Sequence, residues 1–186
     1  MAPLVALLLG IGCNAASTLT TSFEARFGRR IGLAFTILLR NVLGIPLWVL
    51  GLVTAIASPA PLLLHLAPGA RSAAWCLIGA GGILIAWALI HLRLRAMAPT
   101  TSDRLEAGGP YAWVRHPIYG GVLLQLPGIL LLWPTPVVAI ACAFTLAWLP
   151  AQAWLEERDL LRRMPEYAEY ARHVPRFIPR LPSGAA

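Results

Sequence analysis

The sequence contains no lysine and few charged residues of any kind. Arg supplies all 15 basic side chains, Asp and Glu supply 8 acidic ones, and charged residues make up only 12% of the 186 residues. Hydrophobic residues reach 58%, and the mean hydropathy is +0.70. Since soluble domains carry about a quarter charged residues, this composition excludes an ordinary soluble fold and indicates a membrane protein.

Cysteine is scarce as well. The three cysteines, Cys13, Cys76 and Cys142, lie far apart and each falls inside an apolar run. A structural metal site needs closely spaced Cys or His pairs, so this spacing predicts inert packing thiols. We therefore expect no metal ligands among the cysteines.

Long apolar runs are abundant, and about 20 such residues cross a hydrocarbon core of about 30 Å as a helix. The predicted spans are Pro3–Ser22, Ile31–Ala57, Ala73–Leu92, Ile118–Trp133 and Pro136–Leu155. We predict an all-α membrane protein with five transmembrane helices, the last two forming a helical hairpin, and an ordered cytoplasmic C-terminal segment. No repeat divides the chain, so we expect one domain, 1–186, with three N-terminal spans in 1–92 and the remaining two in 93–186.

The arginines predict the orientation, because positive charge accumulates in cytoplasmic loops. Thirteen of them fall in three segments that share one side of the membrane: Arg26, Arg29, Arg30, Arg93, Arg95, Arg104, Arg115, Arg158, Arg162, Arg163, Arg172, Arg176 and Arg180. Only Arg71 lies in a loop on the other side. We predict an outside N-terminus and a cytoplasmic C-terminus, in a bacterial inner membrane. The same bias accounts for the net charge of +7, so we expect no nucleic-acid partner.

Several polar side chains gather where a loop enters the fourth span. The stretch Gly109–Gly121 holds Arg115, His116 and two Tyr residues. The predicted hairpin brings this stretch beside Glu156-Glu157 at the end of the fifth span, and Pro117 suits the first turn of a helix. An interfacial belt of aromatic and snorkelling side chains is an equally valid interpretation from the residue types alone.

Arg40 interrupts the second span well inside its apolar run. A charge at that depth is a functional-site hypothesis by default. The alternative is a side chain that snorkels to the interface or pairs with another helix.

The run Tyr-Ala-Trp-Val-Arg-His-Pro-Ile-Tyr-Gly precedes an apolar hairpin and then Glu156-Glu157. Further along stand Glu-Tyr-Ala-Glu-Tyr from Glu166 and Val-Pro-Arg-Phe-Ile-Pro from Val174. In this order and spacing, over roughly 108–181, the chain resembles the isoprenylcysteine carboxyl methyltransferase family, which is related to phospholipid methyltransferases.

The resemblance implies a pocket for the cofactor S-adenosylmethionine, formed by residues 93–186. The implied cofactor-binding residues are Tyr111, Arg115, His116, Pro117, Tyr119, Gly120, Glu156, Glu157, Tyr167 and Tyr170. Arg115 and Glu156 are the expected catalytic residues, and Arg40 is expected to hold the substrate. No metal is expected.

The implied activity is methyl transfer to a lipophilic or membrane-associated acceptor, most like carboxyl O-methylation of a prenylcysteine-type substrate. The expected partners are therefore a lipophilic or lipidated substrate and membrane lipids. Two alternatives stay open at this point: an NADPH-dependent sterol or steroid reductase, and a non-catalytic membrane scaffold.

Overall fold

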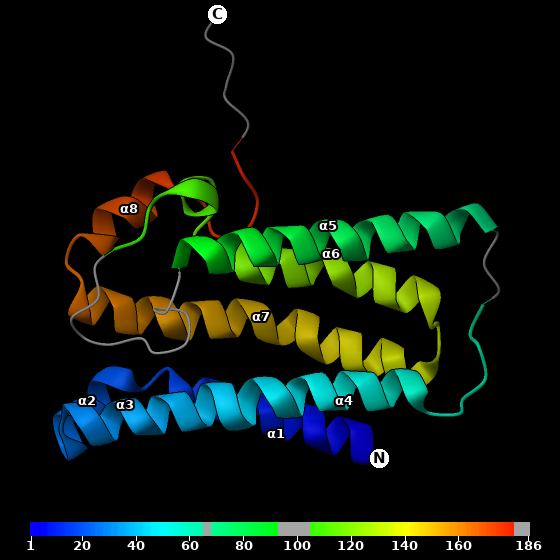
Figure 1. The fold of residues 1–186 in the computed structure, drawn as a ribbon, viewed down its shortest axis with the longest axis horizontal. Helices are drawn as coiled ribbons and strands as arrows, with labels where there is room; N and C mark the ends of the chain where they lie inside the picture. Colours follow the sequence, from blue (N-terminus) through cyan, green and yellow to red (C-terminus); the bar gives the residue numbers. More distant parts are fainter. Residues whose placement is uncertain (65–67, 93–104, 181–186) are drawn as a thin grey trace, which may run out of the picture.

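A computed structural model describes residues 1–64, 68–92 and 105–180. All regular elements within these ranges are helical, and the long helices run along one axis (Figure 1). They are α1 (Ala2–Ser17), α2 (Thr20–Phe27), α3 (Arg29–Ile37), the π-helix η1 (Leu38–Gly44), α4 (Ile45–Ala57), α5 (Pro68–Leu92), the short helix η3 (Gly109–Ala112), α6 (Pro117–Leu132), α7 (Pro136–Arg163) and α8 (Tyr167–His173). The predicted all-helical fold is confirmed.

The number of candidate membrane spans is smaller than the number that the sequence predicts. In the described part of the chain, three helices are long and apolar enough to cross a membrane: Arg29–Ala57, Gly69–Leu92 and Pro136–Arg163. A fourth is added if α1 and α2 count as one span. Helix α6 is apolar but has only 16 residues. The structure thus gives three or four candidate spans where the sequence predicted five.

The predicted first span, Pro3–Ser22, is not one continuous helix, because α1 and α2 meet at a bend of 62°. Ser17 Oγ donates to Asn14 O at 2.7 Å, and Thr18 Oγ1 donates to Ala15 O at 2.7 Å. Such bonds from hydroxyl groups to carbonyls of the preceding turn compete with the helix ladder. They occupy the last carbonyls of α1, and the chain turns there.

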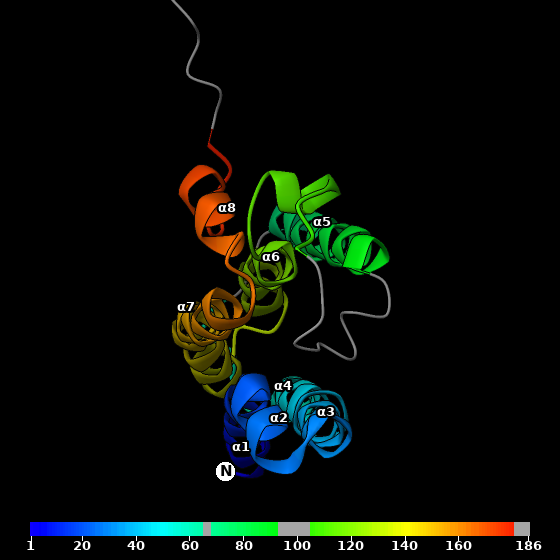
Figure 2. The same cartoon turned by 90° about the vertical axis from the view of Figure 1, so that its left-hand side faces the viewer.

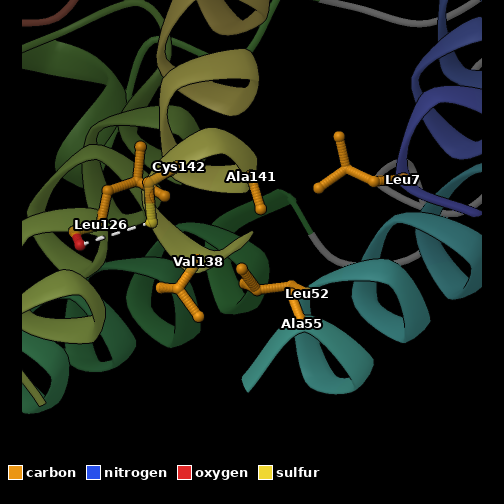
Figure 3. Packing of buried hydrophobic residues seen from close by; sticks show 7 residues of the cluster. All are labelled: Leu7, Leu52, Ala55, Leu126, Val138, Ala141 and Cys142. Carbon is orange, nitrogen blue, oxygen red and sulfur yellow. Dashed lines mark hydrogen bonds between the residues drawn. The ribbon is translucent and has the colours of Figure 1, made fainter. Parts of the chain in front are cut away.

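Helix α7 separates two pairs of helices (Figure 2). Helices α1 and α4 pack closely on one side, α5 and α6 on the other, and α7 contacts α1, α4 and α6. Figure 3 shows the apolar core at this junction. It consists of seven buried residues, namely Leu7, Leu52, Ala55, Leu126, Val138, Ala141 and Cys142. Cys142 is a packing thiol here, as its sequence position predicts.

Two glycines bring α5 and α6 into close contact. A Cβ on Gly121 would lie 2.6 Å from the carbonyl oxygen of Gly81, nearer than real Cβ atoms come. Small residues of this kind let the backbones of membrane helices approach. Helix α6 therefore starts at a fixed position against α5.

Helices α6 and α7 form the predicted hairpin. Thr135 caps α7, since its side-chain oxygen accepts a hydrogen bond from Val138 N at 3.3 Å. At the other end of α7, the chain turns into α8 and returns to the start of α6. There Arg115 N donates to Pro175 O at 2.9 Å and His116 N to Arg176 O at 3.1 Å. The segment 174–180 thus lies on the loop that enters α6, as an ordered C-terminal segment.

Candidate functional site

A pocket of about 170 Å³ lies at the end of the bundle that carries α2 and α8. Its walls come from the bend between α1 and α2, the π-helix η1, the end of α5, residues 105–106, helix η3, the start of α6, the last turns of α7 and the start of α8. These parts are far apart in the sequence. The pocket therefore joins the two helix pairs that α7 holds apart.

Glu156 lies at the centre of the pocket wall. Its Oε1 accepts hydrogen bonds from Tyr119 OH at 2.6 Å and Gln152 Nε2 at 3.3 Å. Arg40 NH2 lies 3.5 Å from the same oxygen. Within the described ranges, the other oxygen, Oε2, has only His116 Nδ1 nearby, at 3.8 Å. One face of this carboxylate thus stays available to a ligand.

Arg40 reaches Glu156 from the π-helical segment of the second apolar helix. Such π-helical turns occur frequently at functional sites. The side chain is 22% exposed and lines the pocket. Arg40 thus pairs with another helix, which is one of the two interpretations that the sequence leaves open, and it also borders the pocket.

Glu157 is the next residue, but it does not line the pocket. Its Oε1 accepts hydrogen bonds from Arg115 Nε, His116 Nε2 and Arg176 Nε, each at 3.0 Å. Its Oε2 accepts from Arg176 NH2 at 2.6 Å. These charge-assisted bonds are the strong kind. We call this group of four residues the Glu157 clasp. It fastens α7 to the start of α6 and to the C-terminal segment.

The remaining donors of Arg115 are also occupied. Its NH1 donates to the carbonyl oxygens of Ala171, at 2.5 Å, and Val174, at 2.9 Å. Arg115 borders the pocket, yet its guanidinium donates hydrogen bonds to Glu157, Ala171 and Val174. This arrangement favours a structural role for Arg115 over the catalytic role that the resemblance implied.

His116 caps α6 and is 7% exposed. Its ring stacks on the ring of Tyr119, with centroids 5.3 Å apart and planes inclined by 3°. One ring nitrogen faces Glu157 in the clasp and the other faces Glu156 in the pocket. The imidazole is therefore the direct link between the clasp and the pocket.

Three further tyrosines lie in or behind the pocket wall. Tyr111 and Tyr167 line the pocket, whereas the Tyr170 hydroxyl lies behind them and donates to Tyr111 O at 2.6 Å. Burial raises the pKa of Tyr170 to about 12 and moves the pKa values of Tyr111 and Tyr167 upward too. All three hydroxyls stay neutral at physiological pH. The Tyr167 hydroxyl is buried without a hydrogen-bond partner among the described residues.

One group near the pocket escaped the sequence analysis. Asp159 accepts hydrogen bonds from Thr21 Oγ1 at 2.7 Å and Thr21 N at 3.3 Å, and Arg163 Nε lies 3.1 Å from its other oxygen. The helical spacing from Glu156 to Asp159 places both on one face, which is a signal that the sequence does contain. The contribution of Thr21 has no such signal, because it depends on the bend after α1.

The structure thus divides the predicted site residues into two sets. Eight of them line the pocket: Arg40, Tyr111, Arg115, His116, Pro117, Tyr119, Glu156 and Tyr167. Three do not, namely Gly120, Glu157 and Tyr170. Gly120 lies beside the C-terminal segment, Glu157 belongs to the clasp, and Tyr170 supports Tyr111. Across the described ranges, no three His, Cys, Asp or Glu side chains lie close enough together to hold a metal ion.

The chain is similar to two bacterial proteins that are named for metal resistance. The chain is 40% identical over 82 residues to the cobalt-zinc-cadmium resistance protein CzcN of Cupriavidus metallidurans, a stretch that covers 43% of the chain and 38% of that protein. It is 32% identical over 117 residues to the nickel-cobalt-cadmium resistance protein NccN of Alcaligenes xylosoxydans, covering 59% of the chain and 52% of that protein. The chain thus matches about half or less of each relative's length.

No protein-family model matches the chain. No solved structure matches it significantly either.

These findings correct the functional predictions from the sequence. The relatives are named for metal resistance, so the assignment to the isoprenylcysteine carboxyl methyltransferase family is wrong, and with it the methyltransferase activity. Sterol reduction has no support either. The expectation of a lipophilic substrate and no metal conflicts with relatives named for cobalt, zinc, cadmium and nickel. The run around Arg-His-Pro led to this error. It describes polar residues at the start of an apolar helix and does not specify a reaction. The binding of S-adenosylmethionine is tested by neither the structure nor the comparisons and stays a prediction.

Proposed function

We propose that this chain is a membrane component of bacterial resistance to divalent transition-metal ions such as cobalt, zinc, cadmium and nickel. The observation that carries the proposal is the likeness to two curated proteins that are both named for resistance to such ions. The apolar helices support a place in the membrane.

The pocket supports a specific role within that function. Ionisable side chains inside a membrane helix bundle mark ion or substrate pathways by default. Here Arg40, His116 and Glu156 come together from three different helices at one end of the bundle. We propose that this pocket is the part of the chain on which resistance depends.

We also propose the finer topology. In it α1 with α2 forms the first span and the 16-residue α6 the fourth, giving five spans in all. At a rise of about 1.5 Å per residue, α6 is about 24 Å long, so it needs its flanking residues to cross the bilayer. The distribution of arginines favours an outside N-terminus and a cytoplasmic C-terminus in a bacterial inner membrane.

Deleting the gene from the bacterium that carries it tests the proposed function. We expect growth to become sensitive to at least one of the four metals, with the inhibitory concentration falling about fourfold or more, and a plasmid copy to restore it. Sensitivity to magnesium serves as the control, since it should not change. Unchanged tolerance of all four metals in the deletion strain would refute the proposal.

A further inference from the structure

The imidazole of His116 lies between two carboxylates. Its Nε2 is 3.0 Å from Glu157 Oε1, and its Nδ1 is 3.8 Å from Glu156 Oε2. The ring cannot turn freely, because it is buried and stacks on Tyr119. Its two nitrogens therefore have separate and fixed tasks.

The hydrogen bond to Glu157 determines which nitrogen carries a proton in the neutral ring. The Glu157 carboxylate also accepts from Arg115 and Arg176, and a carboxylate of this kind has no proton to give. His116 Nε2 is therefore the donor, and the neutral imidazole keeps its lone pair on Nδ1. This lone pair and Glu156 Oε2 then face each other as two acceptors across 3.8 Å. Two acceptors repel unless a proton or a cation lies between them.

The same arrangement is common around protein-bound metals. A ligating histidine usually donates its other ring nitrogen to a carboxylate, which fixes the ring and raises its basicity. Imidazole nitrogen and carboxylate oxygen are both ligands for zinc, cobalt and nickel. At bond lengths of about 2.0–2.1 Å, two ligands of a tetrahedral ion lie about 3.4 Å apart. Closing the observed gap by a few tenths of an ångström would bring Nδ1 and Oε2 to that distance.

We propose that His116 Nδ1 and Glu156 Oε2 form a binding site for a divalent transition-metal ion that passes through the pocket as cargo. Glu157 is the positioning residue of this site, since it acts through His116. The choice of ion rests on the proposed function. The described residues supply no third protein ligand, so water or groups that travel with the ion complete its coordination. Two protein ligands give weak and rapidly exchanging binding, which suits cargo better than a resident cofactor.

The surrounding charges fit an ion held loosely. Arg40 approaches Oε1 of Glu156, the oxygen that also accepts from Tyr119 and Gln152. Oε2 is thereby left to the ion, while the positive charge of Arg40 nearby opposes tight binding.

The test is a metal titration of the purified, tag-free protein in detergent, after removal of metals with a chelator. Cobalt(II) is followed by its visible absorption and zinc by calorimetry. We expect one ion per chain in the wild type and at least a tenfold loss of affinity in both His116→Gln and Glu156→Gln. Glutamine at 116 can still donate to Glu157, so this variant keeps the clasp while losing the ring nitrogen.

A matched control is present on α8. His173 Nδ1 lies 3.4 Å from Glu169 Oε1, but both side chains are exposed, by 72% and 62%. We expect His173→Gln to bind cobalt as the wild type does. Wild-type affinity in both pocket variants would overturn the proposal.

Absence of binding to the wild type would also overturn it and would leave His116 as a bridge between two carboxylates. The gene deletion separates the two proposals. Resistance without binding rejects this site alone, whereas binding without any change in tolerance rejects the proposed function.

Discussion

Glu156 and Glu157 are neighbours in the sequence, yet they face different surroundings. Glu156 borders the pocket and keeps one oxygen nearly free, whereas four charge-assisted hydrogen bonds occupy Glu157. Successive residues of a helix point about 100° apart, so a pair of this kind cannot serve one ligand equally. At the residue scale, one carboxylate is available for binding and the other stabilises the fold.

Removing Arg176 tests the structural part of this division. The hydrogen bond to Glu157 raises the pKa of the Arg176 guanidinium, which thus stays charged. In Arg176→Ala, the buried Glu157 loses two of its four donors, and we expect the free energy of unfolding to fall by about 1–2 kcal/mol, allowing for the partial exposure of Arg176. Thermal unfolding in detergent, followed by circular dichroism, measures the change. The exposed Arg180 is the control, and Arg180→Ala should shift stability by less than about 0.5 kcal/mol. Equal stability of the two variants would show that the clasp contributes little.

Replacing Arg40 tests the charge balance of the pocket. Arg40→Gln removes a positive charge 3.5 Å from Glu156 while Tyr119 and Gln152 still hold that carboxylate. Because the repulsion between Arg40 and a bound cation disappears, we expect the affinity for cobalt to rise severalfold. Calorimetry on the purified protein gives the value. Arg71→Gln, at the start of α5, is the matched control and should leave the affinity unchanged. Weaker binding in Arg40→Gln would mean that the cation does not lie beside Glu156.

Sequence patterns found eight of the pocket-lining residues but not their separate roles. Arg115, His116 and Glu156 were predicted to meet, and they do. The clasp escaped prediction because Arg176 reaches Glu157 only after α8 turns the chain back. Thr21 reaches Asp159 only through the bend after α1. Short sequence patterns do not show which distant segments the fold brings back into contact.

At the scale of elements, the crossing of α5 and α6 fixes the position at which α6 starts. Gly121 of α6 and Gly81 of α5 meet with no room for a side chain. Since α6 begins with the residues that follow His116, any shift at this crossing moves the imidazole as well.

Substitution of Gly121 tests this coupling. In Gly121→Ala, the new methyl group would lie 2.6 Å from Gly81 O, and the helices must separate. We expect a loss of about 1–3 kcal/mol in unfolding free energy, the usual range for overpacking. The control is Gly79→Ala on α5, whose added methyl meets nothing within 4 Å. Alanine is the better helix former by about 0.5–1 kcal/mol, so this variant should be as stable as the wild type or more so. A stable Gly121→Ala protein would contradict the tight crossing.

Helix boundaries could be predicted where apolar runs begin with Pro, as at Pro117 and Pro136. The break between α1 and α2 could not, because hydropathy is blind to hydroxyl groups that bond back to the helix. Hydropathy does not reveal the π-helical turns around Arg40 either, because the apolar sequence there predicts one continuous helix.

At the scale of the whole molecule, α7 separates the two helix pairs, and the pocket lies where all three meet. The five proposed spans would place the two termini on opposite sides of the membrane. Reporter fusions test this topology. We expect a C-terminal green fluorescent protein fusion to fluoresce and a C-terminal alkaline phosphatase fusion to be inactive, because the first folds in the cytoplasm and the second outside it. A dark green fluorescent protein fusion together with an active phosphatase fusion would contradict this orientation.

The central claim is that the pocket carries resistance to transition-metal ions. Its most direct test is the inhibitory concentration of cobalt for the deletion strain that expresses the wild type, Glu156→Gln or Glu169→Gln at equal protein levels. Glu169 is an exposed carboxylate on α8, outside the pocket. The account predicts that the wild type and Glu169→Gln restore tolerance, while Glu156→Gln stays close to the empty vector. Full tolerance with Glu156→Gln would contradict it.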